Sequence, residues 1–481
     1  MNYEEREIDN NRTLKFDSHT NLLEQTAYKY SLQDRETPNL YREIFDYDSI
    51  PKASFNHRNV PMTMPKEIWI TDTTFRDGQQ STSPFTVKNI VQLFKYMHKL
   101  GGEKGIIRQS EFFVYTEKDR DALQSCMDLG YEFPECTSWI RANEKDFQLV
   151  RDLGINETGV LLSCSDYHIY KKMGLTRQKA MDKYLGIVKS ILDKGIRPRC
   201  HFEDITRADY YGFVVPLAEA LQNLADESGI PIKIRACDTM GYGLSYPGVA
   251  LPRSVQGIIY GLHHYAGVPS EMIEWHGHND FYKVVTNAAT AWLYGSSGVN
   301  CSLLGIGERT GNCPLEAMVI EYASLRGTTD GMDLSVITDI ANYFEEEMGY
   351  EIPPRTPFVG RNFNVTRAGI HADGLLKNEE IYNIFNTEKL LNRPATVAVD
   401  SHSGLAGIAH WINSFFRLQN TENAVDKKEP FVALIKEAVD KEYSAGRVTT
   451  FGDWELENIF LEVAYDDYKR ISHIRENKKA K

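Results

Sequence analysis

The chain has 481 residues, of which 42% are hydrophobic and 25% charged, a composition typical of globular proteins with room for a large core and a second unit. Its formal net charge of −13 argues against nucleic acid or an anionic membrane as the main partner. The sequence contains no run of about eighteen apolar residues that could span a membrane, and its seven cysteines are scattered without a CxxC pair, so we expect a reduced, cytoplasmic protein.

Residues 1–62 are polar and carry few periodic apolar runs, so we expect an N-terminal extension with some helix around Thr20–Leu32. From Glu67 onward, apolar or β-branched runs alternate with segments of helical periodicity. The expected strands are residues 67–73, 105–111, 133–138, 158–164, 197–202, 232–237, 272–277 and 298–304. The expected helices between them are Val87–Leu100, Asp119–Leu129, Ala180–Lys194, Val214–Ser228, Leu251–Ala266 and Val284–Tyr294. This alternation across residues 63–330 predicts a (β/α)8 TIM barrel, an α/β fold, rather than an open doubly wound sheet.

The pattern changes again after the predicted barrel. Residues 331–360 are expected to form a linker, and the prolines of Glu351–Phe358 make part of it rigid and extended. Residues 361–481 are expected to form a smaller, mostly helical C-terminal subdomain that contributes catalytic residues, with helices at Leu405–Leu418 and beyond Phe431.

Polar, metal-competent side chains follow two of the predicted strands, and a barrel of this kind places its chemistry at the C-terminal ends of its strands. Asp77 follows the first strand, while His276 and His278 lie two residues apart and therefore point to the same side of the seventh. One carboxylate and two imidazoles leave coordination positions open for catalysis. This set favours Mn2+, with Zn2+, Co2+ or Mg2+ as alternatives. Histidines that merely cap a strand, and a buried ion pair of Arg76 with Asp77, are the structural alternatives.

Other candidates have equally plain structural explanations when taken singly. Gly305–Asn312 is a glycine-rich loop whose Asn312 can reach a metal or a substrate carboxylate, or bind nothing at all. Glu203 follows the fifth strand among other charged residues, where an ion network is the alternative. Thr239 closes the sixth strand, and its hydroxyl suits a carboxylate or a helix cap. His371, on its own, is best explained as a surface histidine.

Three separated motifs, taken together, resemble a known family. They are Thr-Thr-Phe-Arg-Asp-Gly-Gln-Gln at residues 73–80, His-Gly-His-Asn-Asp at 276–280 and Gly-Ile-Gly-Glu-Arg-Thr-Gly-Asn at 305–312. In this order they resemble the signatures of the DRE-TIM metallolyase superfamily. Downstream, Gly369–Lys377 and Ser401–Gly404 resemble the second unit of its Claisen-condensing branch, the isopropylmalate, homocitrate, citramalate and Re-citrate synthases. The resemblance covers about residues 67–415.

The resemblance implies a role for each matched residue in condensing acetyl-CoA with a 2-ketoacid. The implied metal ligands are Asp77, His276, His278 and Asn312. The implied catalytic residues are Arg76, Glu203, His371 and Tyr382. The implied substrate-binding residues are Arg76, Glu111 and Thr239. Arg76 would stabilise the developing enolate oxygen of the thioester, while the other three catalytic residues would transfer protons.

The second strand bears on which 2-ketoacid is used. Isopropylmalate synthases typically carry Glu-Ala-Gly-Phe-Pro there, whereas this chain has Arg108-Gln-Ser-Glu-Phe-Phe-Val-Tyr115. Basic side chains near the pocket would bind a second substrate carboxylate, and the candidates, each with a structural role as its alternative, are Arg108, Arg141, His168 and His201. We therefore expect oxaloacetate, as in Re-citrate synthases. The alternatives are 2-oxoglutarate, as in homocitrate synthases, and isopropylmalate or citramalate synthesis.

Alternatives from other classes stay open at this point. A retained barrel can serve as an acyl-CoA-sensing binding protein, because fold does not fix function. A superfamily lyase or carboxyl transferase is a further alternative. Synthases of this branch are typically homodimers in which the second unit of one chain covers the barrel of the other, so His371 and Tyr382 would act either in cis or in trans.

Overall fold

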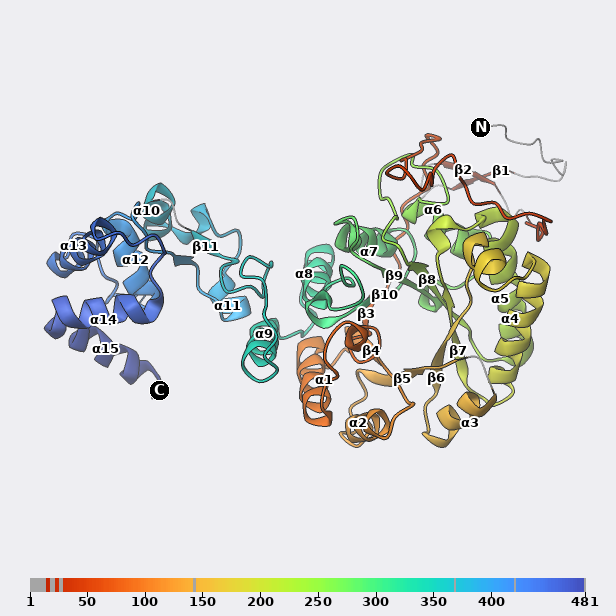
Figure 1. Cartoon of the computed structure of the whole chain (residues 1–481), viewed down its shortest axis with the longest axis horizontal. Helices are drawn as coiled ribbons and strands as arrows, with labels where there is room; N and C mark the ends of the chain where they lie inside the picture. The colour runs from red at the N-terminus through yellow and green to blue at the C-terminus, as the bar shows by residue number, and fades with distance from the viewer. Residues whose placement is uncertain are drawn as a thin grey trace. The chain divides into compact units, whose positions relative to one another are not determined.

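The computed structural model describes residues 14–17, 22–25, 29–141, 144–366, 369–418 and 421–479. The chain divides into two compact units, Met1–Asp333 and Leu334–Lys481. The first contains a closed barrel of parallel strands, and the second is mainly helical (Figure 1). No helix within these described ranges is long and apolar enough to cross a membrane.

The barrel closes in the strand order β10-β3-β4-β5-β6-β7-β8-β9. Its strands are β3 (Trp69–Asp72), β4 (Ile107–Phe112), β5 (Glu135–Trp139), β6 (Glu157–Leu161), β7 (Arg197–Phe202), β8 (Lys233–Asp238), β9 (Ile273–Gly277) and β10 (Gly298–Cys301). Parallel pairing of β10 with both β9 and β3 completes the cylinder. The predicted α/β TIM barrel is confirmed, and all the strand C-termini consequently lie at one end of it.

Helices follow the strands and cover the outside of the barrel (Figure 1). They are α1 (Val87–Gly101), α2 (Glu117–Met127), α3 (Glu144–Asp152), α4 (Arg177–Leu192), α5 (Val215–Ser228), α6 (Val255–His264), α7 (Val284–Leu293) and α8 (Leu315–Arg326). Short helical turns are η1 (Gly78–Gln80), η2 (Tyr167–Lys172), η3 (Ile205–Arg207), η4 (Tyr210–Val214), η5 (Ser270–Met272) and η6 (Leu303–Gly305). Thr86 and Thr116 form capping boxes that satisfy the first amide groups of α1 and α2.

The barrel interior carries buried charges rather than only the branched apolar residues common in this fold. Glu157 accepts hydrogen bonds from Arg199 Nη1 at 2.7 Å and from Lys233 Nζ at 3.0 Å. Arg199 also donates to Glu111, which lies nearer the strand ends. Because each buried charge faces an opposite one, the cost of desolvating it is offset. The network therefore links the interior of the barrel to the C-terminal ends of its strands.

The N-terminal extension is attached to the barrel. Strands β1 (Leu14–Asp17) and β2 (Leu22–Gln25) pair antiparallel, so the helix expected around Thr20–Leu32 is wrong over β2, and part of that range lies outside the described residues. Further on, the amide of Asn56 donates to the carbonyl of Gly248 at 3.1 Å. The extension, red in Figure 1, consequently runs beside the loop that leads into α6.

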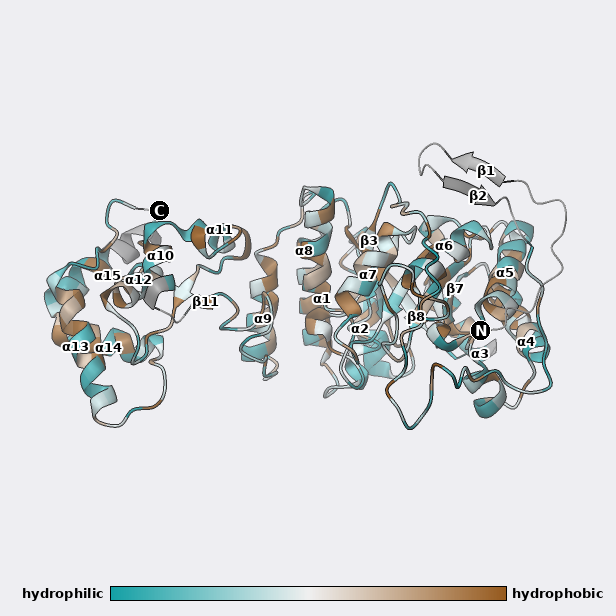
Figure 2. Ribbon diagram, turned by 90° about the horizontal axis from the view of Figure 1, so that it is seen from above, coloured by the Kyte–Doolittle hydropathy of each residue, from teal (hydrophilic) through white to brown (hydrophobic). Residues whose placement is uncertain are grey.

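The second unit is built mainly from helices. Its elements are α9 (Val336–Glu346), β11 (Val365–Thr366), α10 (Gly369–Lys377), η7 (Glu379–Ile381), α11 (Thr387–Leu391), β12 (Thr396–Val397), α12 (Leu405–Phe415), α13 (Pro430–Ser444), α14 (Asp453–Val463) and α15 (Tyr465–Lys479). Helices α12 to α14 share a core that includes Ile412, Val432 and Phe460, and Figure 2 shows hydrophobic and hydrophilic residues along the same helices. Helix α9 lies in the stretch expected to be a linker and packs against α11.

Candidate active site

Three buried side chains converge at the C-terminal end of the barrel. Asp77 follows β3 and its amide donates to Thr73 O at 2.8 Å, which holds it at the start of η1. His276 lies within β9, and His278 follows that strand directly. One ligand atom from each of Asp77, His276 and His278 lies within 4.8 Å of the others. These residues are therefore close enough to share one cation, although Asp77 is far from the two histidines in the sequence.

Neighbouring amides orient these groups. His276 Nδ1 lies 2.8 Å from Asn300 Oδ1, which leaves Nε2 facing His278 Nε2 at 3.3 Å. Asn312 Nδ2 donates to Asp77 Oδ2 at 2.8 Å, while Asn312 Oδ1 is buried without a hydrogen-bond partner among the described residues. Two imidazole nitrogens, a carboxylate and an orphaned amide oxygen form a donor set that suits a divalent transition metal.

Burial sets the protonation of this cluster. It lowers the pKa of His276 to about 3, assisted by the neighbouring His278, and it likewise lowers the pKa of His278. Burial alone would raise the pKa of Asp77, but Arg76 and the two histidines outweigh it and hold that pKa below its ordinary value. At neutral pH the site thus holds neutral imidazoles and an ionised carboxylate, the forms that bind metals.

Arg76 is fixed beside the cluster by two carboxylates. Its Nε donates to Glu111 Oε2 at 2.8 Å and its Nη1 to Asp77 Oδ1 at 2.8 Å, whereas Nη2 makes no hydrogen bond to any described residue. Glu111, on β4, also accepts from Arg199 and Arg235 inside the barrel. Burial raises the pKa of Glu111, but these guanidinium groups outweigh it and leave the pKa well below its usual range. The carboxylate of Glu111 therefore contacts three guanidinium groups and fixes that of Arg76, while its part in substrate binding stays a prediction.

Glu203 lies at the end of β7 among polar partners. Ser163 Oγ donates to its carboxylate, and His168 Nδ1 lies 3.0 Å from its Oε2. Burial raises the pKa of Glu203, but the hydrogen bonds from His168 and Ser163 outweigh it and lower the pKa overall. Thr239 follows β8, and its hydroxyl accepts the amide of Asp204 at 2.8 Å. Both predicted residues thus lie at neighbouring strand ends of the barrel.

The four basic residues expected near the pocket have different surroundings. Arg108 lies at the start of β4, with its guanidinium over the rings of Trp69 and Phe133 at 4.9 and 5.0 Å, so the structure does not bring it to the strand ends. His201 is buried inside the barrel, and burial lowers its pKa well below 6.5, so it supplies no positive charge. Both predictions were wrong because residue type alone does not tell how far along its strand Arg108 lies, or that His201 is desolvated.

The other two expected basic residues follow the C-terminal ends of strands, Arg141 after β5 and His168 after β6. Arg141 follows β5, and its guanidinium lies over the ring of Tyr115 at 4.5 Å, with 68% of the side chain exposed. His168 contacts Glu203, as described above, and also lies 3.7 Å from Asp204. His168 is therefore the expected basic residue that directly adjoins a predicted catalytic group.

His371 and Tyr382 belong to the second unit. His371 is on α10 and Tyr382 follows η7, and their ring centroids are 4.4 Å apart. Both side chains are exposed. The structure thus brings these two predicted residues together, and their action on the barrel site stays a prediction.

Two residues of the site escaped the sequence reasoning. Asn300, on β10, pairs in register with His276 and holds its ring. Arg235, on β8, joins Glu111 to the interior network. The available signal was a polar or charged residue inside a predicted barrel strand, at Gly298–Cys301 and Lys233–Asp238, where a partner inside the barrel explains it.

Comparison with known proteins shows the family of this chain. The HMGL-like family model matches residues 67–344, more than half of the chain. The chain belongs to the HMGL-like family. The match begins just before β3, ends within α9 and so includes the whole barrel with all four predicted metal ligands. The resemblance to the DRE-TIM superfamily that the three motifs predicted is confirmed.

Proteins similar to this chain include two named citrate (Re)-synthase. That of Clostridium kluyveri is 58% identical over 92% of this chain and 97% of its own. That of Syntrophus aciditrophicus is 55% identical over 89% of this chain and 68% of its own. A 2-phosphinomethylmalate synthase from Streptomyces hygroscopicus is 36% identical over 89% of this chain and 97% of its own. The similarity therefore extends well beyond the barrel.

Proposed function

We propose that this chain is an acyltransferase that condenses acetyl-CoA with oxaloacetate to give citrate and CoA, as a citrate (Re)-synthase. The observation that carries the proposal is the 58% identity to a citrate (Re)-synthase along almost the full length of both chains. The buried cluster of Asp77, His276 and His278 beside Arg76 supplies the chemistry that such a condensation needs.

The first requirement is a binding site for a divalent metal. Asp77, His276, His278 and the orphaned Oδ1 of Asn312 would hold it. When bound, the metal would supply a Lewis acid for the keto group of the 2-ketoacid. We favour Mn2+, because mixed oxygen and imidazole ligands with open positions suit it, with Zn2+, Co2+ and Mg2+ as alternatives.

The second requirement is a fixed positive donor for the thioester oxygen. Removing a proton from the acetyl methyl group puts negative charge on that oxygen, and a preorganised donor lowers the barrier. Arg76 meets this need, because Glu111 and Asp77 fix two of its nitrogens while Nη2 has no described partner. Hydrolysis of the condensed thioester then makes the reaction one-way.

Proton transfer is the third requirement. Glu203 is ionised at neutral pH and held by Ser163 and His168, so its carboxylate can accept a proton or orient water. His371 and Tyr382 would act with it from the second unit. We infer a homodimer in which that unit reaches the partner's barrel, and we place the protein in the cytoplasm.

Substrate choice rests on the groups around the metal ligands. Thr239 would bind the carboxylate next to the keto group, and His168 with Arg141 would attract the second carboxylate of oxaloacetate. Homocitrate synthesis from 2-oxoglutarate is the nearest alternative, followed by isopropylmalate or citramalate synthesis. An acyl-CoA-sensing protein is the alternative without catalysis.

A ketoacid panel tests this proposal. Purified chain with acetyl-CoA and Mn2+ is offered oxaloacetate, 2-oxoglutarate, pyruvate and 3-methyl-2-oxobutanoate, and both CoA release and product stereochemistry are measured. We expect oxaloacetate to give the highest kcat/KM. A higher value with 3-methyl-2-oxobutanoate would show that the pocket argument is wrong, and tight acetyl-CoA binding without CoA release on any ketoacid would favour the sensor.

A further inference from the structure

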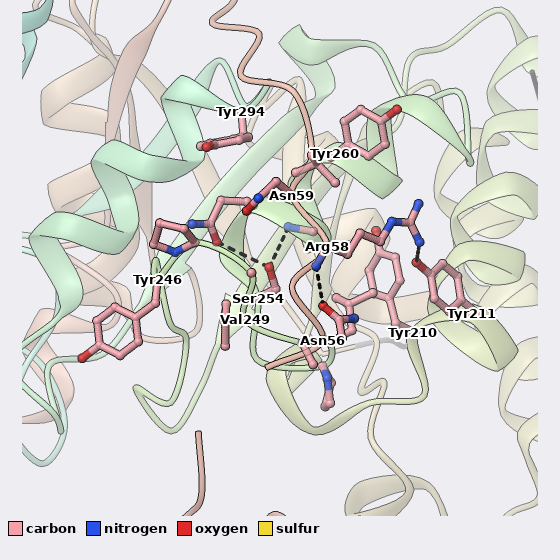
Figure 3. Close-up of a pocket in the computed structure, with 18 of the residues that line it drawn as sticks. Asn56, Arg58, Asn59, Tyr210, Tyr211, Tyr246, Val249, Ser254, Tyr260 and Tyr294 are labelled. Carbon is pink, nitrogen blue, oxygen red and sulfur yellow. Dashed lines mark hydrogen bonds between the residues drawn. The ribbon is translucent and has the colours of Figure 1, made fainter. Parts of the chain in front are cut away.

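A pocket lies between the N-terminal extension and the barrel, and none of the proposed metal ligands lines it. Its volume is about 590 Å3, within the usual range for sites that hold an organic ligand. One wall is formed by Asn56–Val60 of the extension, and another by the loop Tyr246–Pro252 with the start of α6 (Figure 3). None of the motifs discussed above contributes to it, so the proposed chemistry leaves this pocket without a purpose.

Tyrosine rings dominate the wall of this pocket. Figure 3 shows Arg58 and Asn59 between Tyr246 on one side and Tyr211 on the other, with Tyr260 and Tyr294 along the upper edge. Tyrosine offers a flat face for stacking and a hydroxyl for hydrogen bonds, with little conformational entropy to lose. Such a wall favours a planar, polar ring over an aliphatic chain.

Arg58 gives the pocket a positive charge. Its Nη1 donates to Tyr211 Oη at 3.2 Å and its Nη2 donates to Tyr265 Oη. A guanidinium has five N–H donors, so others stay open to a ligand, and no described carboxylate pairs with Arg58. In a chain of net charge −13, a guanidinium held only by neutral phenols is well suited to a phosphate.

The pocket is connected to the catalytic end of the barrel. Tyr246 lies on its rim and accepts a hydrogen bond from Lys283 Nζ at 2.8 Å, with that ammonium also 5.1 Å from the ring centre. Lys283 comes five residues after His278 in the chain. The loop that supplies Tyr246 begins at Thr239, a proposed substrate ligand. A ligand in this pocket therefore adjoins the loops that carry the metal site.

We infer that this pocket binds the nucleotide end of the CoA thioester, with the adenine ring among the tyrosines and a phosphate group on Arg58. The inference rests on the proposed use of acetyl-CoA and adds the site that holds it. Oxaloacetate is too small and lacks an aromatic ring, so it leaves the tyrosine wall unused. The pantetheine arm would extend past Tyr246 and Lys283 toward the metal ligands. Free adenine nucleotides share this chemistry, and the experiment separates them from CoA.

The test compares two thioesters in the full chain. Arg58→Gln removes the charge, and Asn59→Trp fills the pocket should the first variant fold poorly. With acetyl-CoA, each variant should raise KM about tenfold, which corresponds to roughly 1.4 kcal/mol, while kcat and the KM for oxaloacetate stay unchanged. S-acetylpantetheine lacks the nucleotide, so its kcat/KM should be the same in wild type and variants. Arg326→Gln on the surface of α8 is the matched control and should change nothing.

Calorimetric titration with CoA, adenosine 3′,5′-bisphosphate and ATP gives a readout independent of turnover. Weaker CoA and bisphosphate binding in Arg58→Gln supports the inference even if the wild type condenses no ketoacid, in which case only the proposed function fails. An unchanged KM for acetyl-CoA in both variants overturns it. An equal loss of kcat/KM with S-acetylpantetheine also overturns it, because the variants would then have damaged the enzyme as a whole. Loss of ATP binding alone also overturns it, because the pocket would then serve a free nucleotide.

Discussion

At the scale of single residues, the site depends on burial as much as on residue type. Asp77, His276 and His278 are common residues, but desolvation keeps the two imidazoles neutral, and Arg76 keeps the carboxylate ionised. The cluster is therefore ready for a metal at neutral pH without first losing protons. Asn300 adds the orientation of one ring, which is the usual role of a second layer around metal ligands.

Removal of a ligand should abolish metal binding while the barrel persists. We expect Asp77→Ala and His278→Ala to lose bound metal by mass spectrometry of the purified protein, with far-ultraviolet circular dichroism unchanged. Asn300→Ala, which frees the ring of His276 and also removes the hydrogen bond to Thr71 Oγ1, should weaken metal affinity by about 10–100-fold. His263→Ala, outside the site on α6, is the control. Wild-type stoichiometry in both ligand variants would contradict the assignment.

A buried acid near the glycine-rich loop gives a pH dependence at this same scale. Burial raises the pKa of Glu316 to about 7, and its carboxylate accepts the amide of Leu304. The unfolded state releases this proton once the pH exceeds the ordinary glutamate pKa of 4.5, whereas the folded state keeps it up to about pH 7. The contribution to the free energy of unfolding is therefore fully present below pH 4.5 and is lost as the pH rises to about 7. Between these two pH values the free energy of unfolding falls by about 3 kcal/mol.

Glu316→Gln should remove this dependence. Calorimetric unfolding of both proteins from pH 4.5 to 8 is the measurement, and the variant should be the more stable one at pH 8 while the two agree near pH 4.5. Glutamine keeps an acceptor for Leu304. Parallel pH profiles for the two proteins would show that Glu316 is not protonated in the fold.

At the scale of elements, strands bring distant residues into contact and leave little space between them. Gly159 on β6 lies against Glu111 and His201, two residues from β4 and β7. A Cβ at this position would come within 2.7 Å of His201 Nε2 and 3.1 Å of Glu111 Oε1. The glycine thus keeps room for the carboxylate that orients Arg76.

Gly159→Ala should therefore disturb catalysis from outside the substrate site. The displaced Glu111 would shift Arg76, and such misplacement can lower kcat by up to about 100-fold, while overpacking costs about 1–3 kcal/mol of stability. Gly186→Ala is the matched control, since it lies inside α4 with no atom within 4 Å of the added carbon. It should stabilise that helix by about 0.5–1 kcal/mol. Wild-type kinetics in Gly159→Ala would refute the positioning role of Glu111.

At the scale of the whole molecule, the proposed catalytic groups are divided between two compact units. The proposed metal ligands belong to the first unit, and His371 with Tyr382 belongs to the second. The proposed homodimer unites them across two chains, because a symmetric pair lets each second unit serve the other barrel. Action in cis is the alternative, and the two arrangements differ in how inactive chains complement each other.

Co-expression of two inactive variants separates these arrangements. In a mixed dimer of Asp77→Ala with His371→Ala, the barrel of the His371→Ala chain keeps its proposed metal ligands. If His371 acts in trans, that barrel receives an intact His371 from the Asp77→Ala chain. Random pairing should then restore roughly a quarter of the wild-type sites. Action in cis restores none, because each chain carries a defect in its own site. The variants expressed separately, and then mixed without exchange of subunits, are the control for residual activity.

Sequence periodicity was sufficient for much of the fold. Alternating strands and helices are local patterns, so all the barrel strands and helices such as α1 and α7 could be placed from residue order alone. Helices α3 and α8 were missed, because α3 is short and highly charged and the apolar residues of α8 do not gather on one face. The hairpin β1–β2 was missed because strand pairing depends on a partner segment and not on one segment's own propensity.

The sequence by itself determined the barrel, its family and the three residues of the buried cluster, because strand periodicity and the motifs that follow strands are properties of short segments. Tertiary structure decided what those residues experience. Closing the cylinder placed three guanidinium groups on Glu111, made His201 neutral and left Arg108 between two aromatic rings. It also created the tyrosine pocket from the extension and the loop before α6. Burial, charge state and cavities arise only when segments far apart in the chain come into contact. The pattern within one short segment does not reveal which other segments it will contact.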